Sequence, residues 1–207
     1  ANKSVDFVLF NEGVYALRDL LKTNLKDYLN KVQGIGYKEE NNLILNKSNQ
    51  LVPQDRMQHD MPGYAWDLLP KNKNLLDKYR AHYWHNFFSD EGRTPFAAIY
   101  SSLGCRFGCN FCMINIVNRT DTDDNISAAD SRLMRHWDVD FFLEQLEFLN
   151  ENNVYTVRLS DEMFFLNKKF YTPILQGIVD RGLKFNLWAY ARVDTIREDQ
   201  LALFKSA

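Results

Sequence analysis

The sequence predicts an α/β protein whose second half begins a (β/α) barrel. Residues 95–207 alternate short apolar runs with longer stretches in which apolar residues recur at helical spacing. Such alternation with short connections is typical of parallel β/α units. The chain has 207 residues, of which 45% are hydrophobic, and this length suits one domain plus part of another.

Residues 1–45 are expected to be the end of an α/β domain. An apolar run over 5–10 predicts a strand, 11–13 form a turn, and an amphipathic helix follows to Leu25. Two short strands are then predicted around a polar turn at 39–42.

Residues 46–94 are predicted to connect this domain to the next one. The stretch 46–63 is polar and contains two prolines, which is typical of a linker. The stretch 64–95 is rich in aromatic residues, and we expect a helical segment there that packs onto a domain surface. His82 and His85 lie on either side of Trp84 and are interpreted as packing histidines rather than metal ligands.

Residues 95–207 are predicted to form the first half of the barrel. Strands are expected at 95–102, 154–160 and 184–191, and helices at 138–152, at 168–181 with Gly182 as C-terminal cap, and from Asp194 or Thr195 through Phe204. A closed (β/α) barrel needs about eight strands, so we expect the chain to be a fragment that stops inside the domain. Barrel chemistry lies at the C-terminal strand ends, which directs attention to the segments that follow these three strands.

The chain has three cysteines, Cys105, Cys109 and Cys112, in the spacing C-x3-C-x2-C. Disulfide frameworks use many cysteines spread along a chain, so this cluster predicts metal ligands in a reducing compartment. Structural zinc sites take four ligands, and His85 or His136 are the candidates for a fourth. Alternatively, three thiolates hold a four-iron cluster and leave one iron open, as a catalytic site requires.

With Phe111 directly before the last cysteine, this motif resembles that of the radical S-adenosylmethionine enzymes. The resemblance implies that the cysteines ligate a 4Fe-4S cluster, that S-adenosylmethionine chelates its fourth iron to yield a 5′-deoxyadenosyl radical, and that Phe111 packs near the cofactor. Glu162 in "SDE" takes the place of the carboxylate in the family's Gly-Gly-Glu-like motif, which binds the methionine amino group. Arg192 in "YARVD" sits where an Arg faces the methionine carboxylate.

The acidic pair in "SDE" and the first half of the chain look like the cobalamin-binding branch of that family. The stretches "VDFVLFNEGVYALRDLL", "VQGIGYKEENNLIL" and "MPGYAWDLLP" resemble the C-terminal end of a Rossmann-like cobalamin-binding domain and its linker. The D-x-H-x-x-G motif that supplies the lower-axial histidine is not in this chain. The resemblance implies a TIM-like radical S-adenosylmethionine barrel, cobalamin-dependent methylation of an unactivated carbon, and an external flavodoxin- or ferredoxin-like electron donor.

Several alternatives remain open at this point. Radical rearrangement or oxidation is the alternative within the family, and a non-catalytic zinc or iron–sulfur module is the alternative outside it. Single residues also have structural alternatives. Glu162 is then a carboxylate at the start of a helix, and Asp161 is a helix cap. Arg192 then pairs with Asp194 or Glu198 on the surface, and Phe111 lies in the core.

Charge and hydropathy restrict the partners. The formal net charge is -2 and the sequence pI about 6.1, so the chain has no electrostatic footprint for nucleic acid or anionic lipid. No apolar run approaches the roughly 18 residues of a membrane-spanning helix, and no signal peptide opens the chain. We therefore expect a cytoplasmic enzyme with a small-molecule substrate, and we assign no catalytic side chain, because the residues that grip the substrate are expected on later strands.

Overall fold

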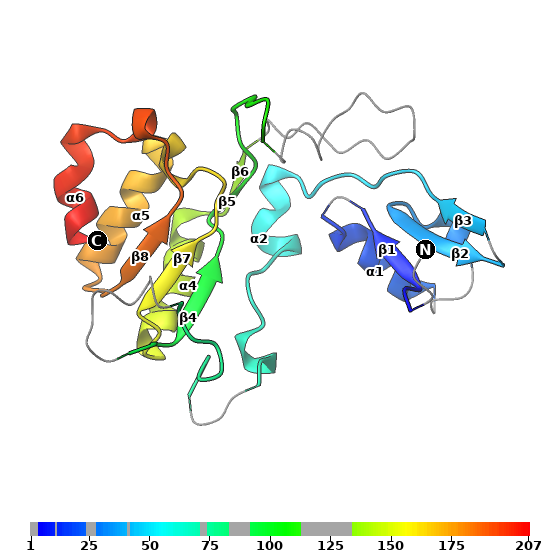
Figure 1. The fold of residues 1–207 in the computed structure, drawn as a ribbon, viewed down its shortest axis with the longest axis horizontal. Coiled ribbons are helices and arrows are strands. Elements are labelled where there is room, and N and C mark those ends of the chain that lie inside the picture. Colours follow the sequence, from blue (N-terminus) through cyan, green and yellow to red (C-terminus); the bar gives the residue numbers. More distant parts are fainter. Residues whose placement is uncertain are drawn as a thin grey trace. The chain divides into compact units, whose positions relative to one another are not determined.

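The computed structural model describes residues 4–10, 12–23, 28–40, 42–70, 74–82, 92–112 and 134–207 (Figure 1). They belong to two compact units, which are described separately: residues 1–61 with 104–134, and residues 62–103 with 135–207. The domain boundaries predicted after residues 45 and 94 remain predictions. Among the described residues, no helix has the length and apolar character needed to cross a membrane.

The first unit contains an antiparallel sheet with one helix packed on it. Strands β1 (Phe7–Leu9), β2 (Ile35–Glu39) and β3 (Asn42–Leu45) follow the order β1-β2-β3, and helix α1 (Val14–Lys22) contributes to the same small core. This core is made of Ala16, Leu20, Val32, Ile35 and Tyr37. The predicted strand, helix and hairpin are confirmed. The helix ends before Leu25, which lies outside the described residues.

The segment 46–61 is extended except for two short helical turns, η2 (Gln54–Arg56) and α2 (Met57–Asp60). Asp60 anchors this segment to α1, because its carboxylate accepts a hydrogen bond from the Tyr15 hydroxyl at 2.7 Å. The linker therefore has a fixed attachment to the first unit.

The helical segment predicted within 64–95 is wrong for the residues that can be described. The part 64–70 and 74–82 contains the single 3-10 turn η3 (Trp66–Leu68), and residues 83–91, with Trp84 and His85, lie outside the described residues. Pro70 favours extended backbone at Leu69 (φ -73°, ψ 143°), and Leu76 is left-handed at φ 57°. A helix cannot run through either position. Trp66 nevertheless packs into the core of the second unit, as expected for an aromatic segment on a domain surface.

The second unit is built on a parallel sheet with the order β4-β7-β8. Its strands are β4 (Phe96–Ile99), β7 (Thr156–Leu159) and β8 (Asn186–Ala189), and Ile99, Leu159 and Ala189 pair across them in one row. Helices α4 (Val139–Glu151) and α5 (Lys168–Asp180) form the crossovers. The mixed α/β class, the three strands and these two helices are confirmed. Closure into a barrel remains a prediction.

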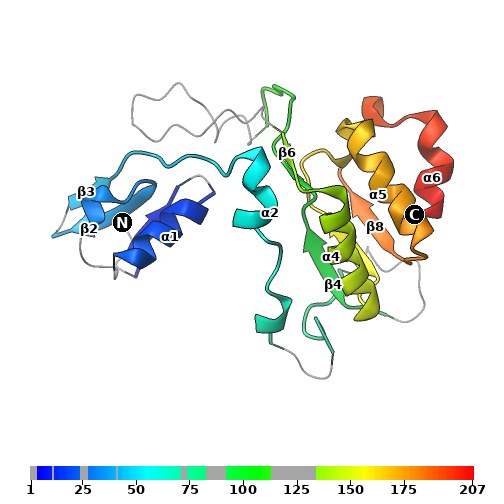
Figure 2. The same cartoon turned by 180° about the vertical axis from the view of Figure 1, so that it is seen from behind.

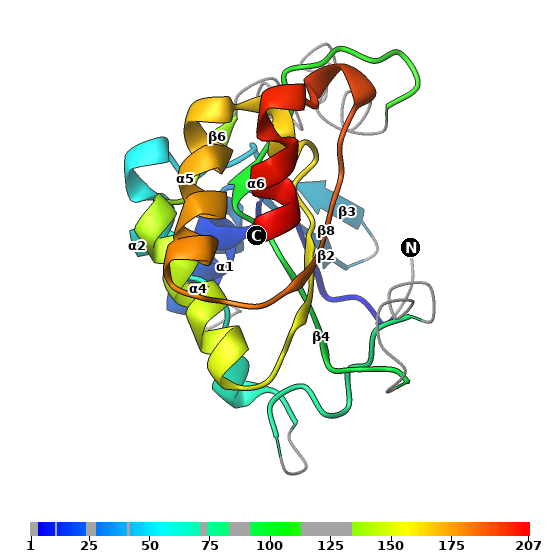
Figure 3. The same cartoon turned by 90° about the vertical axis from the view of Figure 1, so that its left-hand side faces the viewer.

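Helices α4 and α5 lie on the same face of this sheet, as Figures 2 and 3 show. Alternate strand residues point to opposite faces, and those on the helical side share one core with both helices. This core includes Ala97, Ile99, Val157, Leu159, Phe142, Leu146, Ile174 and Ile178. The opposite face presents Ala98, Arg158 and Trp188, which pair with one another in one row across the three strands. Two faces of such different character are what a barrel segment requires, with helices outside and a lumen inside.

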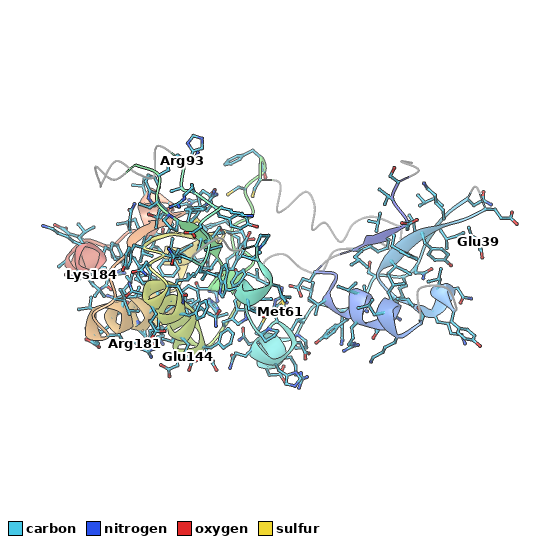
Figure 4. All side chains as sticks on the ribbon, turned by 90° about the horizontal axis from the view of Figure 1, so that it is seen from below. Glu39, Met61, Arg93, Glu144, Arg181 and Lys184 are labelled. Atoms are coloured by element: carbon cyan, nitrogen blue, oxygen red, sulfur yellow. The ribbon has the colours of Figure 1, made fainter. Side chains whose placement is uncertain are left out.

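Helix α5 ends as predicted at Gly182, which has φ 64°. The N–H of Gly182 donates to the Val179 carbonyl and that of Leu183 to the Ile178 carbonyl, both at 3.0 Å, which is the hydrogen-bond pattern of a Schellman motif. Next to it, Arg181, which Figure 4 labels, reaches Asp140 and Glu147 of α4 at 3.3 and 3.0 Å. These ion pairs connect the two crossover helices at their surface.

The last predicted helix is much shorter than expected. Two 3-10 turns, η6 (Val193–Thr195) and η7 (Glu198–Gln200), precede α6 (Leu201–Ser206). The Thr195 hydroxyl donates to the Arg192 carbonyl at 2.8 Å, and Ile196 is extended (φ -80°, ψ 129°). Local side-chain hydrogen bonds of this kind compete with helix formation, so the helix begins later.

A short antiparallel ladder closes the segment that carries the cysteines. Strand β5 (Ser102–Leu103) pairs with β6 (Arg135–His136), and the Trp137 N–H donates to the Ser101 carbonyl at 3.1 Å. We call this ladder the stem. Leu103 and Arg135, which stand before and after residues 104–134 in the sequence, are therefore paired with each other, a feature that sequence patterns did not predict.

Candidate functional site

Three segments leave the parallel sheet at one edge. After the paired row formed by Ile99, Leu159 and Ala189, the chain continues into residues 100–103, 160–162 and 190–192. The carboxyl ends of parallel strands are where β/α folds collect their functional groups. Two of the residues proposed from the sequence, Glu162 and Arg192, come from these segments, and the cysteines follow the first of them.

The cysteine loop begins with a backbone turn that needs glycine. Gly104 has φ 94°, a region that residues with a Cβ rarely adopt, and it lies directly between the stem and Cys105. None of the three cysteines forms a disulfide, and Cys105 is buried while the other two are half-buried. The Cys112 N–H donates to the Cys109 carbonyl at 3.0 Å, so the second half of the motif is a tight turn.

The donor set of this loop fits an iron–sulfur cluster. Three soft thiolates come from one short loop, and thiolates are the ligands that such clusters take. The thiols are not gathered around one point, since the described residues contain no group of three His, Cys, Asp or Glu side chains that could hold a metal ion. His136, one of the candidates for a fourth ligand, lies in β6, where its ring is 4.3 Å from that of Phe170.

Asp161 is the most completely buried charged residue at the strand ends, with 0% exposure. Its carboxylate accepts hydrogen bonds from the Ser101 N–H at 3.1 and 3.2 Å, from the Ser101 hydroxyl at 2.7 Å and from the Ser102 hydroxyl at 2.5 Å. The interpretation of Asp161 as a helix cap is therefore wrong. It binds the chain that leaves the neighbouring strand.

Glu162 is half-buried and lies between two buried residues, Asp161 and Met163. The 3-10 turn η5 (Phe164–Leu166) separates it from α5, which begins at Lys168. Glu162 is thus outside the first turn of α5, and the macrodipole of that helix does not explain its position.

Arg192 forms a two-point ion pair with Asp194. Its Nε and Nη2 donate to the two carboxylate oxygens at 2.9 and 2.8 Å, and this pairing holds the pKa of Asp194 below its usual value. The surface pair that the sequence offered as an alternative is therefore present. Because 42% of the Arg192 and 60% of the Asp194 side chain are exposed, water screens the pair and its contribution to stability is small. A ligand carboxylate with two well-placed oxygens can replace Asp194.

Phe111 is 90% exposed, so the core position considered for it is wrong. Its ring stands in solvent, one residue before Cys112. An aromatic side chain in such a place is available to contact a cofactor.

Two further features of this edge were not found from the sequence. The Tyr100 N–H donates to the Tyr64 hydroxyl at 2.9 Å, and burial raises the pKa of Tyr64 to about 12. On the non-helical face of the sheet, the Arg158 guanidinium lies 4.8 Å from the centre of the Tyr190 ring. The charged Arg158 between buried Val157 and Leu159 was a signal for a second, polar face that strand alternation could have shown.

The chain is similar in sequence to one known protein and in structure to others. The chain is 29% identical to the uncharacterized methyltransferase PH0819 of Pyrococcus horikoshii over 196 residues, which cover 94% of this chain and 36% of that protein. The structure of the cobalamin-dependent S-adenosylmethionine radical enzyme OxsB with aqua-cobalamin and S-adenosylmethionine bound aligns with a TM-score of 0.56 at 20% identity, over 94% of this chain and 24% of that one. No protein-family model matches.

The chain therefore spans about a third of the methyltransferase and about a quarter of the OxsB chain. It resembles a methyltransferase in sequence and shares the fold of a part of OxsB.

Proposed function

We propose that this chain is part of a radical S-adenosylmethionine enzyme. Its Cys105, Cys109 and Cys112 would hold a 4Fe-4S cluster, and Glu162 and Arg192 would bind the amino acid end of S-adenosylmethionine. The observation that carries the proposal is the C-x3-C-x2-C loop, which follows the first strand of a parallel sheet whose next two strands end before Glu162 and Arg192. The likeness to part of OxsB supports the same reading.

The residues of this chain suit the binding roles that the proposal gives them. A reduced cluster, when bound, supplies the electron that cleaves S-adenosylmethionine to the 5′-deoxyadenosyl radical. The Glu162 carboxylate accepts hydrogen bonds from an ammonium group. Arg192 already binds one carboxylate at two points and offers the same planar donors to another. The exposed Phe111 ring would be available to pack near the cofactor.

We further propose that the reaction is cobalamin-dependent methylation of an unactivated carbon in a small molecule. The sequence relative is called a methyltransferase, and the OxsB structure holds cobalamin. In this reading residues 1–45 end a Rossmann-like cobalamin-binding domain. Their strands pair antiparallel, which suits the edge of such a sheet. Radical rearrangement or oxidation is the alternative outcome of the same chemistry, and a flavodoxin- or ferredoxin-like protein would supply the electron.

The test uses the full-length protein, reconstituted with iron and sulfide without oxygen. Electron paramagnetic resonance of the reduced protein with and without S-adenosylmethionine reports on an open iron, and 5′-deoxyadenosine reports on cleavage. Asn110→Ala, an exposed position in the same loop, is the matched control for Cys109→Ala. We expect wild type and Asn110→Ala to give a signal that S-adenosylmethionine shifts, and Cys109→Ala to lose it together with the iron. Bound zinc, or a cluster that S-adenosylmethionine leaves unchanged, would contradict the proposal and indicate a non-catalytic module.

A further inference from the structure

Asp161 connects the two segments on which the proposed site depends. It directly precedes Glu162 in the sequence, and its carboxylate binds Ser101 and Ser102. Ser102 is the first residue of the stem, and Cys105 follows three residues later. A single side chain thus joins the backbone next to Glu162 to the base of the cysteine loop.

The stem is a short ladder. It consists of two residue pairs, Ser102 with His136 and Leu103 with Arg135, and a ladder of this size is marginally stable on its own. Ser101 is held from both sides, because its N–H and hydroxyl donate to Asp161 while its carbonyl accepts the Trp137 N–H. Asp161 therefore fixes the point at which the cysteine loop leaves the sheet.

Packing alone does not explain a carboxylate at position 161. Its partners among the described residues are neutral N–H and O–H groups, and both serines are buried with it. A buried carboxylate without a cationic partner costs free energy that a neutral side chain of similar size would avoid. In return it can accept several hydrogen bonds at once, stronger and more directional than those of an amide.

We propose that Asp161 is a positioning residue that holds Ser101 and Ser102, at the base of the stem, next to the strand end that carries Glu162. Through these two serines it fixes the point from which the chain continues into the cysteine motif. This role rests on the proposed function. It predicts that weakening the connection disturbs S-adenosylmethionine binding more than it disturbs the fold.

The variants are Asp161→Asn, which keeps the size and replaces one acceptor by a donor, and the milder Ser102→Ala, which removes one hydroxyl. Thr156→Val is the matched control, because the Thr156 hydroxyl makes one side-chain hydrogen bond, to Thr94 at 2.8 Å, at the opposite end of the same strand. All are made in the full-length protein. Hydrogen exchange of the stem amides is measured before cluster loading, and KM and kcat for S-adenosylmethionine cleavage are measured after it, per loaded cluster.

We expect exchange at residues 101–103 and 135–137 to rise about tenfold or more in Asp161→Asn and less in Ser102→Ala, since hydrogen bonds to a charged group are lost. KM for S-adenosylmethionine should rise by about tenfold while kcat changes less. Thr156→Val should leave both within about twofold of wild type. If Asp161→Asn does not fold, the same comparison is made with Ser102→Ala.

The two ways of failing are distinguishable. Wild type that cleaves S-adenosylmethionine, together with variants whose stem exchange and KM match the Thr156→Val control, overturns the positioning role alone. Wild type that neither loads a cluster nor cleaves S-adenosylmethionine overturns the proposed function, and the role of Asp161 with it.

Discussion

Replacing Asp194 by asparagine tests whether Arg192 binds a ligand or serves as one half of a surface ion pair. Arg192 and Asp194 make a two-point pair at 2.9 and 2.8 Å. If the guanidinium binds the carboxylate of S-adenosylmethionine, Asp194 competes with the ligand. Asp194→Asn removes this competition and should tighten binding.

The size of the effect follows from the exposure of the pair. With side chains 42% and 60% exposed, water screens the pair and Asp194 competes only weakly, so KM for S-adenosylmethionine should fall by no more than about fivefold. Arg192→Lys has the opposite effect, because it keeps the charge but loses the planar two-point contact. A hydrogen bond to a charged group contributes about 1.5–3 kcal/mol, so we expect KM to rise by about tenfold or more.

The chain offers a matched control on the same segment. Arg197 and Asp199 have the same spacing, lie 3.1 Å apart and are 61% and 51% exposed, so Arg197→Lys changes a similar pair that follows no strand end. Steady-state cleavage by the reconstituted full-length protein, with iron content as normalisation, gives the three KM values. A KM that is the same for Asp194→Asn, Arg192→Lys and Arg197→Lys would refute the ligand role and leave a surface pair.

Three further predictions concern stability and cluster loading. Gly177→Ala should lower the melting temperature by about 2–8 °C in a circular dichroism melt. The new Cβ would lie 2.4 Å from Leu143 Cδ1, and this overpacking outweighs the gain in helix propensity. An unchanged or raised melting temperature would contradict this. Asp199→Asn should destabilise the protein at neutral pH, because the carboxylate pairs with Lys168 and Arg197. The difference from wild type should shrink as the pH falls from about 4 through the pKa of about 2 that these pairs give Asp199; a difference as large at pH 2 as at neutral pH would refute it. Gly104→Ala should reduce the iron bound per chain, because it places a Cβ on a residue with φ 94°. Gly108→Ala should leave the iron content unchanged, because the added Cβ would meet open space. Equal iron contents in the two variants would contradict this.

The parts of the fold that follow a repeating pattern could be predicted from the sequence. Helices α4 and α5 and the three parallel strands each have several apolar residues at one spacing, and the Gly182 cap needs one residue in one conformation. The start of α6 could not be predicted. It depends on the hydrogen bond from Thr195 to the Arg192 carbonyl, and the sequence does not show whether such a bond or a helical turn is more stable.

The residue types of the site could be predicted from the sequence, but the contacts between these residues could not. The cysteine spacing and the carboxylate of Glu162 are visible as motifs. The stem is too short for any periodic signal, since each strand has two residues. Asp161 reads as a helix cap by its type, and its partners lie sixty residues earlier in the chain. Contacts of that kind are set by the pairing of β4 with β7 and become visible only in the folded chain.

The strand-end edge also differs from the rest of the second unit in where it places a charged side chain. Away from this edge, apolar side chains fill the core and ion pairs such as Arg181 with Glu147 lie on the surface. At the edge, Asp161 is a fully buried carboxylate whose hydrogen-bond partners in the described part of the chain are neutral donors. Burying a carboxylate in this way costs stability. Natural sequences accept such costs mainly at functional sites, so the position of Asp161 favours this edge as the site independently of the cysteine motif.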